Sequence, residues 1–176
     1  PRRGPPGRPA SGGSRALNGA VERLAARINE RFGSGSYRPI ALWREPHEPP
    51  KIFSYYRAAD LCYVSSLHDG MNLVAKEFVA ARDDERGVLL LSRFTGAARE
   101  LPEALLVNPY DLEESSEALA TALSMPPAEQ ADRMRAMRAF LAHFNVYRWA
   151  GRILADAAIL RQRERLAGRR AATARC

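Results

Sequence analysis

The sequence predicts an α/β fold in which a parallel sheet is covered by helices on both faces. Short, almost wholly apolar segments alternate with longer amphipathic ones, and turns rich in Gly, Pro, Asn and Asp separate them. Strands of such a sheet are buried on both faces, so they form continuous apolar runs. The hydrophobic fraction of 46% is enough for a core. No apolar run reaches the roughly 20 residues that span a bilayer.

Four segments have the composition of buried strands, and the segments between and after them have helical periodicity. In residues 17–32, for example, Leu17, Val21, Leu24 and Ile28 recur at three- and four-residue steps, which is typical of one apolar helix face. The predicted strands are residues 39–43, 61–64, 88–91 and 104–107. The predicted helices are residues 17–32, 50–59, 73–81, 97–101, 112–123, 127–142 and 145–165.

The net charge of +7 is concentrated at the two ends of the chain. Residues 1–36 hold seven arginines and two acidic residues, and residues 147–176 hold eight and two. Residues 37–146 hold 12 basic and 16 acidic residues, a net charge of −4. We therefore predict a disordered Pro/Gly/Arg-rich tail over residues 1–15, one domain over residues 16–163, and an Arg/Ala-rich tail over residues 164–176. A basic module that binds nucleic acid or another polyanion is one hypothesis for the function, although the ends carry no known nucleic-acid motif.

Cysteine and histidine usage argues against disulfides and metal sites. Cys62 lies in an apolar run and Cys176 is the last residue, so we expect free thiols in a reducing cytoplasm. The first residues contain no apolar stretch of the kind found in secretory signals. The sequence has no CxxC motif and no His pair at ligand spacing, so we expect no metal.

The loop after the predicted strand 61–64 is the strongest candidate for chemistry, because parallel sheets bind ligands at the carboxyl ends of their strands. A polar, Gly-containing loop leads directly into a helix there. We expect free backbone N–H groups of Met71, Asn72 and Leu73 to point out of the helix start, where they and the helix dipole favour phosphate or a sugar hydroxyl.

Two carboxylates belong to the same segment, and their spacing is compatible with two roles. Asp69 precedes the predicted helix and Glu77 lies about one turn inside it. Together they suit the binding of sugar and ribose hydroxyls. Equally, Asp69 can simply cap the helix while Glu77 is a solvated helix residue. Spacing alone leaves both interpretations open.

Longer stretches of the sequence resemble the trehalose-6-phosphate synthase family, retaining glycosyltransferases of family 20 with two Rossmann-like domains. The resemblance covers roughly residues 17–163. It is carried by YYRAADLCYVSSL, HDGMNLVAKEF, GVLLLSRFTGAARELPEALLVNPYD and FNVYRWAGRIL. It implies a Rossmann-like sheet from the C-terminal, donor-binding half of a two-domain (GT-B) glycosyltransferase, incomplete at its N-terminal side.

The resemblance also implies a reaction and a set of site residues. Glucose would pass from UDP-glucose, a substrate rather than a cofactor, to glucose 6-phosphate, giving trehalose 6-phosphate without a metal. Asp69 would be the catalytic residue and accept hydrogen bonds from the glucose hydroxyls, and Glu77 would hold the ribose hydroxyls. The backbone of four residues would contact the sugar and diphosphate: Gly70, Met71, Asn72 and Leu73.

Departures from the family pattern limit what the chain is expected to do by itself. No segment resembles the acceptor-binding domain or the DRLDYTKG-like motif, whose Arg and Lys neutralise the donor diphosphate. We therefore expect a fragment that is inactive alone, from an enzyme that could be a homo-oligomer at full length, with no membrane or nucleic-acid partner. Glucosylglycerol-phosphate synthase, which shares the donor loop, is the alternative within this class.

Several other residues near the predicted crevice have simpler interpretations. We expect His68 to be a loop or sugar-contacting residue, Lys76 to be solvated or paired with an acid, and Arg93 and Arg99 to be exposed. Residues 108–111 are predicted to form a turn and helix cap. Four apolar residues late in the chain are predicted to pack against the other domain and to form an exposed apolar patch without it: Phe144, Tyr147, Trp149 and Ile153.

Overall fold

The structure, a computed structural model, describes the backbone of residues 12–173 and the side chains of residues 16–163. The chain divides into two compact units, Pro1–His47 and Glu48–Cys176. The first unit contains α1 (Gly12–Phe32). The elements of the second are α2 (Pro49–Ala58), β1 (Leu61–Val64), α3 (Leu73–Ala81), β2 (Val88–Ser92), the 3₁₀ helix η1 (Gly96–Arg99), β3 (Leu105–Val107), α4 (Leu112–Ser124), α5 (Pro127–His143) and α6 (Val146–Thr173).

The three strands form one parallel sheet in the order β1-β2-β3, which confirms the predicted fold class. Leu61 lies opposite Val88 in the first pair, and Leu90 lies opposite Leu105 in the second. Every residue of the central strand β2 is buried. The apolar run VLLLS therefore has the double burial expected of a parallel sheet.

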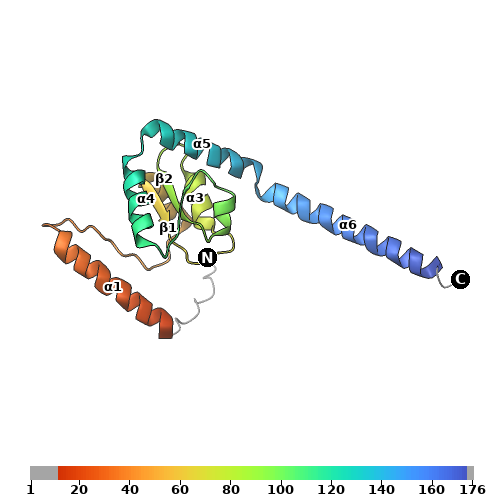
Figure 1. The fold of residues 1–176 in the computed structure, drawn as a ribbon, viewed down its shortest axis with the longest axis horizontal. Helices are drawn as coiled ribbons and strands as arrows, with labels where there is room; N and C mark the ends of the chain where they lie inside the picture. The colour runs from red at the N-terminus through yellow and green to blue at the C-terminus, as the bar shows by residue number, and fades with distance from the viewer. Residues whose placement is uncertain (1–11, 174–176) are drawn as a thin grey trace. The chain divides into compact units, whose positions relative to one another are not determined.

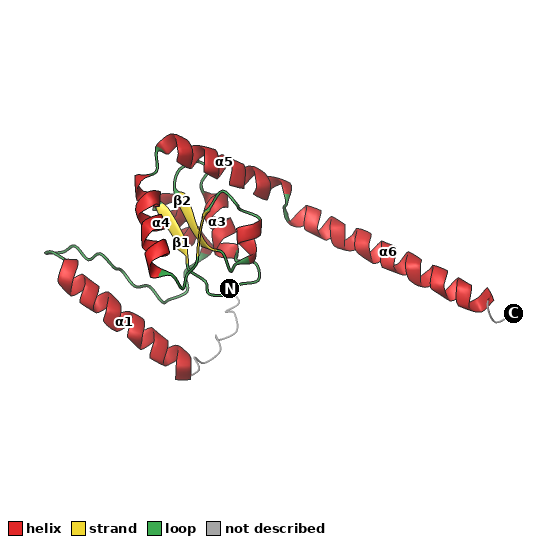
Figure 2. Cartoon of the chain, viewed as in Figure 1, coloured by secondary structure: helices red, strands yellow, loops and turns green. Residues whose placement is uncertain are grey.

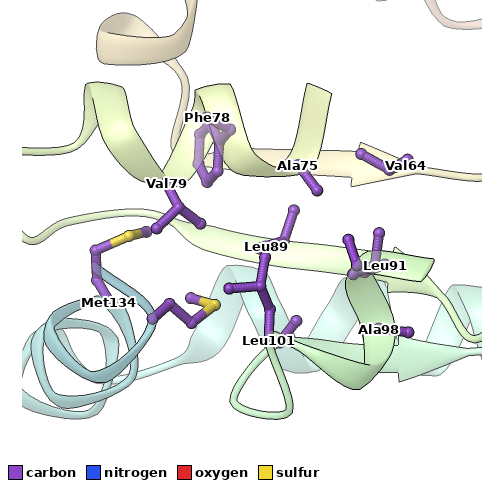
Figure 3. Close-up of a cluster of buried hydrophobic side chains, with 12 residues drawn as sticks. Val64, Ala75, Phe78, Val79, Leu89, Leu91, Ala98, Leu101 and Met134 are labelled. Atoms are coloured by element: carbon purple, nitrogen blue, oxygen red, sulfur yellow. The ribbon is translucent and has the colours of Figure 1, made fainter. Parts of the chain in front are cut away.

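Helices cover both faces of this sheet, with α3 and α4 on opposite sides of the strands (Figures 1 and 2). Leu89 and Leu91 point into the larger core, where they pack with Phe78 of α3 and Met134 of α5 (Figure 3). Val88 faces the other layer, which contains Ala122 and Met125 at the end of α4. Neighbouring residues of β2 thus serve opposite layers, as the twofold repeat of a strand requires.

The strand predicted over residues 39–43 is absent, and this prediction was wrong. Residues 40–44 have no regular structure, and the side chains of Leu42 and Trp43 are exposed. The backbone of Ile40 is paired instead with a side chain, since Asn29 both donates to its carbonyl oxygen and accepts from its N–H, each at 2.8 Å. An apolar run becomes a strand only where another strand pairs with its backbone.

The two ends of the chain also differ from the sequence prediction. Helix α1 begins at Gly12, so part of the tail predicted over residues 1–15 is helical, and residues 1–11 lie outside the described residues. Helix α6 continues to Thr173, through most of the tail predicted over residues 164–176. The predicted domain limits at residues 16 and 163 stay a prediction. The four late apolar side chains are all exposed, as expected without a partner for this segment: Phe144, Tyr147, Trp149 and Ile153.

Backbone hydrogen bonds join the loop after β1 to the loop after β2. The N–H of Asp69 donates to the carbonyl oxygen of Phe94 (3.3 Å), and the N–H of Gly96 donates to that of Asp69 (3.0 Å). The N–H of Ala97 donates to the carbonyl oxygen of Met71 at 3.0 Å. At Gly96 the two loops approach each other so closely that a Cβ atom would collide with the backbone of Gly70. This approach requires glycine.

We expect Gly96→Ala to lower the free energy of unfolding by about 1–3 kcal/mol, because the added methyl group forces two hydrogen-bonded backbones apart. Urea denaturation measures the effect. Gly151→Ala is the matched control, since a Cβ there meets no atom of the described chain and alanine favours the helix interior. Equal stability of the Gly96→Ala variant and the parent chain would contradict the role of this contact.

Burial raises the pKa of the Cys62 thiol in β1 from 9.0 to about 11. The folded state therefore keeps a proton that the unfolded chain releases, and this contribution to stability is complete below about pH 9 and lost as the pH rises through about 11. Between about pH 8 and pH 10.5 we expect the parent chain to lose on the order of 1–2 kcal/mol more stability than Cys62→Ala. Urea denaturation of both chains at the two pH values, under reducing conditions, tests this, and parallel losses would contradict it.

Candidate functional site

The candidate site begins at the carboxyl end of β1, where residues 65–72 lead into the N-terminus of α3. The exposed side chain of Asp69 organises this loop. Its Oδ1 accepts hydrogen bonds from the N–H groups of Met71 (3.1 Å) and Asn72 (3.0 Å), and its Oδ2 accepts one from Nδ2 of Asn72 (3.0 Å). The prediction that the N–H groups of Met71 and Asn72 are free was therefore wrong, because a carboxylate two or three residues earlier already pairs them.

Asn72, rather than Asp69, caps α3. Its Oδ1 accepts a hydrogen bond from the N–H of Ala75 at 2.9 Å. Its backbone is left-handed, with φ at 65°, a conformation that asparagine tolerates better than most residues. Only 6% of Asn72 is exposed, and its Nδ2 also contacts the hydroxyl of Ser66 at 3.3 Å. The simple interpretation of Asp69 as the helix cap is thus wrong, although Asp69 holds the residue that is the cap.

Two backbone N–H groups remain at the helix start. Within the part of the chain that the structure describes, those of Leu73 and Val74 form no hydrogen bond. The side chains of both residues are exposed, at 59% and 44%. First-turn N–H groups combined with the helix dipole attract anions. Of the three N–H groups predicted to be free, that of Leu73 is free among the described residues, and the N–H of Val74 joins it at the first turn of α3.

Glu77 lies one turn further into α3 and is partly buried. The structure does not join it to Asp69 by a hydrogen bond; its Oε2 accepts one from the hydroxyl of Tyr56 on α2, at 3.3 Å. The pKa of Tyr56 is raised to about 12, mainly because the ring is partly buried and secondly because of the negative charge of Glu77. Glu77 is therefore not simply a solvated helix residue. Tyr56 was not predicted as a site residue, because it lies 21 positions from Glu77, on another helix.

The flanking charged residues are mostly paired. Lys76 forms an ion pair with Glu100, which fits one of the two expectations for it. Arg93 pairs with Glu114, whose other carboxylate oxygen accepts from the N–H of Asn108. Arg99 is exposed, as predicted. The positive charges of Lys76 and Arg93 are thus each paired with a neighbouring carboxylate.

Exposed rings form a row along the carboxyl edge of the sheet. The ring centroid of Phe94 lies 5.8 Å from that of His68 and 5.9 Å from that of Tyr110. The turn after β3 ends in a helix cap, as predicted, since Asp111 accepts from the N–H groups of Glu113 and Glu114, both at 3.0 Å. The loops after the three strands thus each contribute one ring to this row, His68, Phe94 and Tyr110.

Neither a metal centre nor a membrane span is found in the described part of the chain. No group of three or more His, Cys, Asp or Glu side chains among the described residues is placed to hold a metal ion. No helix there combines the length and the apolar character required to cross a bilayer. Cys62 carries a free thiol, whereas Cys176 lies outside the described residues.

Known proteins resemble this chain over most of its length. A glucosylglycerol-phosphate synthase from Synechocystis sp. is 42% identical over 137 residues, which are 78% of this chain and 28% of that protein. A trehalose-6-phosphate synthase from Klebsiella pneumoniae is 44% identical over 137 residues, 77% of this chain and 29% of that protein. The chain therefore spans less than a third of the length of these relatives.

A solved structure shares the fold. The UDP-forming α,α-trehalose-phosphate synthase from Burkholderia xenovorans, crystallised in complex with glucose-6-phosphate, superposes with a TM-score of 0.81 at 43% sequence identity. The match covers 85% of this chain and 33% of that one. The sequence pattern of glycosyltransferase family 20 matches residues 6–159 of the chain. Sequence and fold agree, and the chain belongs to glycosyltransferase family 20.

Proposed function

We propose that the chain is the donor-binding part of a retaining glucosyltransferase that transfers glucose from UDP-glucose to a phosphorylated acceptor. The observation that carries this proposal is the ordered Asp69 loop, which leads directly into a helix start whose N–H groups at Leu73 and Val74 have no partner among the described residues. Membership of the family and the name of the UDP-forming relative support UDP-glucose as the donor.

Each part of the site suits one part of a nucleotide sugar. The helix start supplies N–H groups and a positive dipole end for the diphosphate, on which negative charge grows as the glycosidic bond breaks. The Asp69 carboxylate accepts three hydrogen bonds from its own loop. Because an ionised carboxylate has about four acceptor positions, it retains capacity for a sugar hydroxyl. Glu77, further along the same helix, would accept from the ribose hydroxyls.

The favoured acceptor is glucose 6-phosphate, which would give trehalose 6-phosphate. The Burkholderia relative that was crystallised with glucose-6-phosphate supports this choice. A phosphorylated glycerol acceptor is the second candidate, because the Synechocystis glucosylglycerol-phosphate synthase is similar to this chain to nearly the same degree as the Klebsiella trehalose-6-phosphate synthase. The proposed donor site serves either acceptor.

Thermal unfolding of the 176-residue chain in UDP-glucose tests the donor site. We expect stabilisation of about 1.4 kcal/mol when the ligand concentration is ten times its Kd, which corresponds to a rise in Tm of a few degrees. Asp69→Asn and Glu77→Ala are expected to remove most of this rise, because each loses an acceptor for ligand hydroxyls. Each variant is compared with its own ligand-free Tm, so that a change in basal stability does not count.

Glu117→Ala is the matched control for this experiment. Glu117 is an exposed carboxylate on α4, outside the proposed site, and its removal should leave the rise in Tm unchanged. No rise for the parent chain at millimolar UDP-glucose contradicts the donor site. A salt-sensitive affinity for polyanions without any effect of UDP-glucose would favour the polyanion-binding hypothesis instead.

We expect the 176-residue chain alone to form neither trehalose 6-phosphate nor glucosylglycerol phosphate. The sequence holds no segment like the family motif whose Arg and Lys neutralise the diphosphate, and the loss of one such group typically lowers the rate by about 10²–10³. Incubation with UDP-glucose and either acceptor, followed by mass spectrometry, measures the product. Product formation above that of the Asp69→Ala variant would refute this expectation.

A further inference from the structure

Tyr56 brings a second helix to the candidate site. It lies on α2, and its hydroxyl donates to Oε2 of Glu77 on α3 at 3.3 Å. Its ring packs edge-on against Phe78 of the core and against Phe53, with centroids 6.1 Å apart in both pairs. The ring is thus held by the larger core while the hydroxyl reaches the carboxylate.

A buried arginine fixes α2 with respect to α3. Arg82, just after α3, is only 4% exposed. Its Nη1 lies within hydrogen-bond distance of three carbonyl oxygens at the end of α2, those of Tyr56 (3.0 Å), Arg57 (2.7 Å) and Ala59 (2.8 Å). Its Nε lies 3.0 Å from the carboxylate of Asp84. The guanidinium therefore ties the end of α2, including the backbone of Tyr56, to the helix that carries Glu77.

We propose that Tyr56 is a positioning residue that orients the Glu77 carboxylate toward the ribose hydroxyls of a nucleoside diphosphate. The inference rests on the proposed function and extends it to a residue outside the donor loop. A glutamate side chain loses rotamer entropy when a ligand fixes it. A hydroxyl that already holds Oε2 reduces this cost and leaves Oε1 with both acceptor positions for the ligand.

The protonation of Tyr56 favours its hydrogen bond to Glu77. The raised pKa of Tyr56, about 12, keeps its hydroxyl protonated in the neutral pH range. The hydroxyl can therefore donate whenever Glu77 is ionised. A hydrogen bond to a charged acceptor is also stronger than one between neutral groups.

The decisive experiment compares Tyr56→Phe with the parent chain for two ligands, UDP and its 2′,3′-dideoxy analogue, by isothermal titration calorimetry. Phenylalanine keeps the ring and its packing and removes only the hydroxyl. We expect UDP to bind about 3- to 10-fold more weakly to the variant, the range that one lost hydrogen bond explains. The affinity for the dideoxy analogue, which lacks the hydroxyls that Glu77 would hold, is expected to stay unchanged.

Tyr63→Phe supplies the matched control. Tyr63 donates its hydroxyl to that of Ser115 on α4 at 3.0 Å, so the variant loses a hydroxyl of the same kind away from Glu77 and should bind both ligands like the parent. In a Glu77→Ala background, Tyr56→Phe should have no further effect on UDP binding.

The ratio of the two affinities separates a positioning role from a structural one. An equal loss for both ligands, or no loss for either, overturns the inference while the donor site stands. A parent chain that binds both ligands equally well also overturns it, because no ribose hydroxyl is then recognised. If the parent chain binds neither ligand at millimolar concentration, the proposed function fails as well.

Discussion

The site depends on the backbone hydrogen bonds that join the loop after β1 to the loop after β2. Asp69 both donates to Phe94 and accepts from Gly96, so two parallel strands continue their pairing beyond the end of the sheet. The absence of a side chain at Gly96 allows this approach. Once the two loops are joined, the position of Asp69 follows from that of β2, every residue of which is buried.

Asp69 has a structural role in its loop beside the binding role that we propose for it. It satisfies two backbone N–H groups and the amide of Asn72, which in turn caps α3. The donors at the helix start are thereby divided into two sets. Those of Met71 and Asn72 stabilise the loop, and those of Leu73 and Val74 have no partner among the described residues.

The sequence alone predicts those helices and strands whose limits are set by the local hydrophobic pattern. The limits of α3 and the position of β1 were predicted correctly, because an apolar run and a polar, Gly-containing turn mark them. The strand at residues 39–43 was predicted wrongly, because its apolar composition does not show that Asn29 pairs with the backbone of Ile40. The contact between Tyr56 and Glu77 joins two helices whose relative placement depends on Arg82, and no periodicity reports a contact of this kind.

The internal hydrogen bonding of the Asp69 loop has a consequence for how such enzymes diversify. Every hydrogen bond that the structure shows for Asp69 comes from the loop itself or from its neighbour after β2. A loop that is self-supporting in this way can be inherited as a unit while the surfaces around it change. The similarity of one chain to synthases with different acceptor names, at 42% and 44% identity, is the pattern that such modular inheritance produces.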